Sequence, residues 1–168
     1  MSKAIEAAIR TEKWKKARQL IRAELKERPD SHWLLTRLGL TYYEERAYRT
    51  SLSYCRKALR LAPHCPLALW DYAGSLQMLG RHRIALRVYR QLLSRGVEQI
   101  ARGECGEGRG WARGLMADCL YRQAYSFTEL KEQKAAIDAY RKHLKMRGPG
   151  CRSIYAVRTV KKELSELA

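Results

Sequence analysis

The chain has 168 residues with 34 lysines and arginines against 17 aspartates and glutamates, so its formal net charge is +17. This length suits one domain, and the charge favours acidic partners such as nucleic acid, an anionic membrane or an acidic protein. No stretch approaches the roughly 20 apolar residues of a membrane-spanning helix, and charged residues near the start argue against a secretory signal. The five cysteines lack a CxxC pair, which argues against a disulfide framework or a metal site and favours reduced thiols in the cytoplasm.

The first part of the chain predicts a short helix followed by a longer one. Residues 2–9 and 11–28 both repeat apolar side chains at steps of three and four residues, as one helix face requires. Pro29 ends the longer helix because proline cannot continue the hydrogen-bond ladder. Asp30 or Ser31 then offers a side-chain cap for the next helix.

The next stretch predicts two antiparallel hairpins. The first pairs 32–45 with 48–61, and the second pairs 66–79 with 82–95. Gly39 weakens a helix by about 1 kcal/mol relative to alanine, so we expect the partner helix to approach closely there.

The pattern then shifts and resumes. Leu144 follows Leu93 by 51 residues, which leaves an insertion at 97–113 that contains four glycines. A fourth hairpin is expected within 117–150, and a final amphipathic helix over 152–167 with a polar outer face.

Equivalent residues recur every 34 positions. Leu25, Leu59 and Leu93 keep this step, as do Pro29 and Pro63. A period of 34 in a helical sequence is typical of a tetratricopeptide array.

The unit 32–65 carries the residues that make the comparison specific, namely Leu35, Leu38, Gly39, Tyr42, Tyr48, Ala58 and Pro63. The chain therefore resembles the tetratricopeptide repeat family over roughly residues 12–148. The resemblance implies an all-α fold, a right-handed superhelix of antiparallel helical hairpins (a tetratricopeptide-like α-solenoid) with a C-terminal capping helix. It implies one domain over 1–168, with a partial repeat 1–31, repeats 32–65, 66–97 and 117–150, the glycine-rich insertion 97–113 and the capping helix 152–167.

The sequence also departs from the family. The usual turn glycine is replaced by Arg46 and Lys131, where left-handed backbone costs a residue with a side chain about 1 kcal/mol. One subclass grips acidic tails through lysines and asparagines on its first helices. Because the corresponding positions here include Thr36, Leu40 and Asp71, we predict that this chain lacks such a clamp.

The resemblance implies a protein-interaction scaffold whose first helices line a concave groove. By register, the groove residues are apolar or aromatic with two arginines: Trp33, Arg37, Leu40, Tyr43, Leu67, Trp70, Met78, Tyr121, Arg122 and Tyr125. Aromatic residues and methionine are favoured at binding surfaces. The alternative for any one of them is packing against neighbouring helices. Arg37, Asp71 and Arg122 share one slot, which favours a salt-bridge ladder between repeats over an anchor for a bound peptide.

Basic residues crowd the second helices, which should form the convex wall. A solvated face is the simplest interpretation, and nucleic-acid or anionic-surface binding is the alternative, since Lys and Arg contacts to phosphate drive non-specific binding. The glycine-rich loop around Gly106 and Gly108 lacks the flanking strand and Gly-Lys-Ser/Thr of a phosphate loop, so we interpret it as a rim of the groove.

The scattered histidines and cysteines fit no catalytic arrangement. We therefore predict a non-enzymatic adaptor without cofactor or metal, which binds a peptide or helix of a partner protein in an aromatic groove. The net charge of +17 favours an acidic partner.

Overall fold

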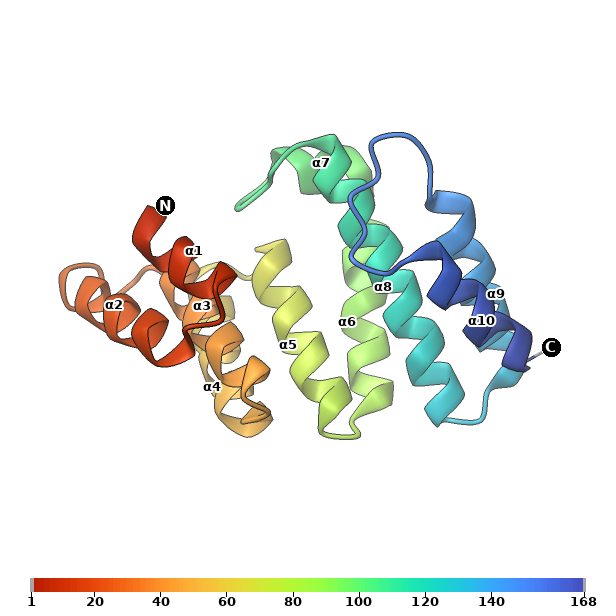
Figure 1. Cartoon of the computed structure of the whole chain (residues 1–168), viewed down its shortest axis with the longest axis horizontal. Coiled ribbons are helices and arrows are strands. Elements are labelled where there is room, and N and C mark those ends of the chain that lie inside the picture. The colour runs from red at the N-terminus through yellow and green to blue at the C-terminus, as the bar shows by residue number, and fades with distance from the viewer. Residues whose placement is uncertain (1, 168) are drawn as a thin grey trace. The chain divides into compact units, whose positions relative to one another are not determined.

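The computed structural model describes residues 2–167, and every regular element in that range is an α-helix (Figure 1). The helices are α1 (Lys3–Arg10), α2 (Trp14–Glu27), α3 (His32–Glu44), α4 (Tyr48–Leu61), α5 (Pro66–Met78), α6 (His82–Ser94), α7 (Gly96–Arg102), α8 (Arg109–Glu129), α9 (Gln133–Met146) and α10 (Val157–Leu167). The predicted all-α fold of helical hairpins is confirmed.

The helices form two compact units, one up to Leu79 with α1–α5 and one from Gly80 with α6–α10. In the first unit, α2 packs on α1 and α3, while α5 packs on α3 and α4. In the second unit, α8 packs on α6, α7 and α9, and α10 lies against α9. The single domain with its repeat boundaries stays a prediction.

The core of the first unit joins consecutive hairpins. Ile5 of α1, Ile21 of α2 and Leu34 and Leu38 of α3 are buried together. Ser31 caps α3 as expected, since its side chain accepts a hydrogen bond from the Leu34 amide at 3.3 Å. Helices α3 and α4 meet closely, because a Cβ added at Gly39 would lie 3.1 Å from the Cys55 Sγ and 3.4 Å from the Ser51 carbonyl oxygen.

The insertion at 97–113 is more regular than expected. Helix α7 covers its first part and α8 begins at Arg109, which confines the irregular backbone to six residues, 103–108. Gly106 serves packing there, because an added Cβ would lie 2.4 Å from the Ala101 carbonyl oxygen. Its amide donates to the Gly103 carbonyl at 3.0 Å, so the backbone folds back tightly on the end of α7.

The last helix begins later than expected, at Val157 rather than at residue 152. Two of the residues that precede it, Arg152 and Ile154, donate their backbone amides to α8 instead of to a helix of their own. We call this stretch, residues 147–156, the α9–α10 segment.

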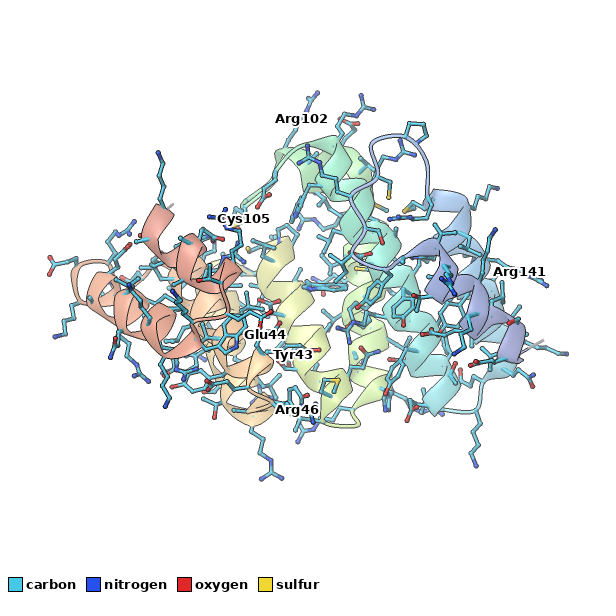
Figure 2. The ribbon with its side chains drawn as sticks, viewed as in Figure 1. Tyr43, Glu44, Arg46, Arg102, Cys105 and Arg141 are labelled. Carbon is cyan, nitrogen blue, oxygen red and sulfur yellow. The ribbon has the colours of Figure 1, made fainter. Side chains whose placement is uncertain are left out.

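Three hairpin turns place a residue with a side chain in the left-handed region. The φ angles are 54° at Glu12, 61° at Arg46 and 59° at Lys131, against 72° at Gly80, where the expected glycine is present. Glu12, Arg46 and Gly80 are 34 residues apart, so the left-handed turn geometry repeats with the sequence period. Arg46 is shown in Figure 2, at the turn between α3 and α4.

Glycine at position 46 is therefore expected to stabilise the protein. Relief of the left-handed strain, about 1 kcal/mol, outweighs the larger backbone entropy that glycine has in the unfolded chain. We expect Arg46→Gly to raise the free energy of unfolding by about 0.5 kcal/mol, measured by urea denaturation. The matched control is Arg56→Gly in the middle of α4, which should lower it by about 1 kcal/mol. A loss of stability in both variants would contradict the interpretation.

Candidate functional site

In the second unit, an extended stretch of the chain itself lies on α8, which is the first helix of the hairpin α8–α9. In Figure 1 the α9–α10 segment crosses α8, and the hydrogen bonds agree with the picture. The Arg152 amide donates to the Gly110 carbonyl oxygen at 3.1 Å, and the Ile154 amide donates to Asp118 Oδ2 at 3.2 Å. Two turns of α8 therefore separate two backbone anchors of the segment.

Two glycines let the segment approach. Gly110, Gly114 and Asp118 follow one another at steps of four residues, so they share one face of α8. An added Cβ at Gly114 would lie 2.3 Å from the Arg152 carbonyl oxygen, and one at Gly110 would lie 2.6 Å from the Gly150 carbonyl oxygen. Any side chain at these positions would collide with backbone.

Asp118 is a buried carboxyl at the centre of this contact, with 4% of its surface exposed. Burial raises the pKa of Asp118 to about 6, while hydrogen bonds from Ser153 and Ile154 and the charges of Arg147 and Arg122 oppose the rise. The desolvation of the carboxylate is thus only partly compensated by its partners.

Two of the predicted groove residues contact the segment. The ring of Tyr121 stacks on Tyr155, with centroids 3.7 Å apart and planes 17° apart. The Arg122 guanidinium lies over the same Tyr155 ring at 5.7 Å. Tyr125, the third predicted residue, is 38% exposed and lies against His82 with ring centroids 6.2 Å apart.

Helix α10 fixes the far end of the segment. Tyr121 and Tyr140 both donate their hydroxyls to Glu163, at 2.8 and 2.6 Å, and Val160 is fully buried among Ala124, Ala139 and Tyr140. The segment is thus fixed by its hydrogen bonds to α8 at one end and by the packing of α10 at the other.

In the first unit, two predicted groove residues face α1. The Arg37 Nε donates to Glu6 Oε1 at 2.9 Å, and the Arg37 guanidinium lies 5.5 Å from the centre of the Trp33 ring. The Trp33 ring itself packs on the buried cluster around Ile5 and Leu34. The Arg37–Glu6 pair joins α3 to α1, and the expected ladder of Arg37, Asp71 and Arg122 stays a prediction.

The remaining predicted residues of this unit lie on α3 and α5. Tyr43 packs edge-on against Tyr48, with ring centroids 5.3 Å apart, and a Cβ added at Gly74 would lie 3.5 Å from the Tyr43 ring. Tyr43 and the neighbouring Glu44 are shown in Figure 2 at the end of α3. Leu40, Leu67 and Trp70 are half-buried. Met78 is 40% exposed.

Sequence reasoning did not anticipate the roles of Gly110, Gly114 and Asp118. A signal was present, because small residues at steps of four in a helix allow a close neighbour, and Gly148-Pro149-Gly150 ends α9 and starts an irregular stretch. Nothing local linked the two features.

The cysteines are all free thiols, and Cys55, Cys65 and Cys119 are buried. Burial raises the pKa of Cys55 and Cys119 well above the usual range of a thiol, which keeps both protonated and unreactive at neutral pH. None of the helices between residues 2 and 167 has the length and apolar character that a bilayer crossing demands.

The described hairpins define a tetratricopeptide-like helical repeat fold, and solved structures agree. A structure of MamA from Desulfovibrio magneticus RS-1, covering residues 41 to the end, has a TM-score of 0.67 and 13% identity over 97% of this chain and 88% of that chain. A crystal structure of MamA gives 0.66 and 16% identity over 99% and 89%.

The first TPR domain of human RPAP3 gives a TM-score of 0.57 and 13% identity over 83% of this chain and 96% of that domain. No protein-family model and no curated protein matches the sequence. At these identities the likeness establishes the fold.

Proposed function

We propose that this protein is a non-enzymatic interaction scaffold that binds a segment of a partner protein on the α3–α5 face of its first unit. We call this face, formed by Leu40, Tyr43, Leu67, Trp70 and Met78, the aromatic face. The observation that supports the proposal is the α9–α10 segment. This segment lies on α8, the first helix of its hairpin, against Tyr121 and Arg122.

The same kinds of contact are available to an external ligand on the aromatic face. Half-buried tryptophan and tyrosine side chains offer large apolar area at low entropic cost, and a few such residues dominate many interfaces. A net charge of +17 favours a partner that carries acidic residues beside its apolar anchors.

Trp70→Ala tests the proposal. Peptides are first selected from a random displayed library on the parent protein, and their affinities are then measured for each variant by fluorescence anisotropy. We expect Trp70→Ala to weaken binding by about 2 kcal/mol, or roughly 30-fold, because a central aromatic anchor is lost. Helical content, followed by circular dichroism, should be unchanged.

Trp111→Ala is the matched control, because Trp111 is a half-buried tryptophan of the other unit. It should bind like the parent. Equal binding by the parent and Trp70→Ala would refute the aromatic face.

A second candidate, nucleic-acid binding, is favoured by one feature of α4. A hollow of about 340 Å³ is lined by Arg49, Leu52, Ser53, Arg56, Lys57 and Arg60. Four cations on one helix suit a phosphate backbone. Binding of a DNA duplex that survives moderate salt and is lost in Arg56→Glu would favour this candidate over the scaffold.

A further inference from the structure

A furrow in the second unit is not used by the aromatic face or by the α9–α10 segment. Helices α6 and α9 both pack on α8 and leave two hollows between them, of about 360 and 430 Å³. The hollows share Leu93 of α6, Leu120 of α8 and Lys142 of α9, so they form one continuous furrow. We call it the α6–α9 furrow.

The hollow that Met146 lines is almost entirely apolar, and the hollow that Gln123 and Asp138 line mixes polar and apolar surface. Leu120 is buried, while Leu93, Phe127 and Met146 are half-buried and line the furrow along its length. Hollows of this size are large enough to take ligand side chains. The lining of α9 runs from Ala135 to Met146, which corresponds to about 16 Å at 1.5 Å per residue.

The rim of the furrow is cationic. Arg90, Lys142 and Lys145 stand along it as exposed side chains. The one carboxylate of the lining, Asp138, is paired with Lys142 at 2.7 Å. Three cations against one carboxylate make the rim complementary to an anionic ligand.

The floor also holds an unsatisfied polar group. Gln123 lines the furrow and is 7% exposed, and its Nε2 has no hydrogen-bond partner among the described residues. A buried amide left unpaired costs free energy, which an acceptor supplied by a ligand would recover.

From these features we propose that the α6–α9 furrow binds an acidic amphipathic helix of a partner protein. A furrow between two helices that lie on a third accepts another helix by ridge-into-groove packing. Three helical turns match its length. The hollows hold side chains rather than a whole helix, so apolar residues of the partner enter while its glutamates or aspartates meet Arg90, Lys142 and Lys145.

The test uses a labelled, designed helical peptide of 15 residues with leucines at i, i+3 and i+10, a glutamine at i+7 whose side-chain carbonyl can accept from Gln123, and glutamates on the flanks. A peptide of the same composition with the leucines scattered around the helix is its control. We expect the ordered peptide to bind the full chain at least tenfold more tightly in fluorescence anisotropy.

The charge test compares two double variants of α9. Lys142→Glu with Lys145→Glu should weaken binding of the ordered peptide at least tenfold. Lys134→Glu with Arg141→Glu makes the same charge change on the same helix outside the furrow lining, and it should change binding less than twofold. Arg141 is shown in Figure 2. Equal losses in both double variants would mean that net charge alone attracts the peptide, and this result would overturn the proposal.

Gln123→Leu is expected to have opposite effects on the stability of the free protein and on peptide binding. It should raise thermal stability of the free protein, because the unpaired amide is removed, and weaken the ordered peptide several-fold, because the ligand loses a donor. Parent-like binding by this variant, or no preference for the ordered peptide, would also overturn the proposal. Trp70→Ala should leave this binding unchanged, so the furrow and the aromatic face succeed or fail separately.

Discussion

Gly114→Ala is expected to lower the free energy of unfolding by about 3 kcal/mol, the upper part of the range for overpacking. Alanine is the better helix former by about 1 kcal/mol, so α8 alone would gain stability. The loss comes from the new Cβ, which would lie 2.3 Å from the Arg152 carbonyl oxygen and 2.4 Å from its carbon. Because these are backbone atoms, the α9–α10 segment must move as a whole.

Urea denaturation measures the loss, and hydrogen exchange locates it. Amides at Arg152 and Ile154, which donate to Gly110 and Asp118, should lose protection first. Gly148→Ala is the control, because the one atom near its added Cβ is the mobile Arg113 Nη2 at 3.3 Å. A Gly114→Ala protein as stable as the parent would mean that the segment does not lie on α8.

Asp118→Asn is expected to stabilise the protein by about 3 kcal/mol at pH 7.5 and to have little effect at pH 4. The pKa of Asp118 is raised by burial from 3.8 to about 6, so the folded protein holds the proton more tightly than the unfolded chain. Stability contributed by the neutral carboxyl is therefore present at low pH and is lost as pH rises from about 4 to about 6. Asparagine stays neutral and still accepts from the Ile154 amide.

The difference in unfolding free energy between Asp118→Asn and the parent separates the effect of Asp118 from that of His143. That histidine is fully buried with its Nδ1 2.7 Å from the Ala117 carbonyl oxygen, and burial lowers its pKa below 6.5. Its contribution has the opposite sign, since stability rises as pH increases toward 6.5.

Because His143 is common to both proteins, its contribution cancels in the difference of unfolding free energies measured from pH 4 to 7.5. A flat difference would show that Asp118 ionises as freely in the folded protein as in the unfolded chain.

The hairpins were predictable because their signals are local and periodic. The step of 34 residues located the helix pairs, and Gly39 was assigned to a close approach. Asp30 or Ser31 was expected to cap the next helix, and Ser31 is the residue that caps it. The left-handed turn at Arg46 was expected because the family that the chain resembles has a turn glycine at this position.

The site was less predictable because a helix pattern tells which face is small or apolar but not what covers it. Tyr121 and Arg122 have the register of groove residues, yet Tyr155 of the chain's own segment lies on both. Similarly, Trp33 was assigned to the groove, and part of its ring packs on the cluster around Ile5. Both contacts involve residues about 30 positions apart that share no repeat.

The hydroxyls of Tyr121 and Tyr140 both donate to Glu163, so α10 covers the end of the last hairpin, α8–α9. Without this helix, Tyr121, Tyr140 and the two alanines that surround Val160, Ala124 and Ala139, would form an uncovered apolar end. In a helical repeat protein, the next hairpin packs on such an apolar end. A protein shortened after residue 156 would therefore expose the same apolar surface on every copy. Because this end would be the same apolar patch on every copy, two copies could pair through it in a closed two-fold dimer, so the polar outer side of α10 keeps the end of the last hairpin from self-association.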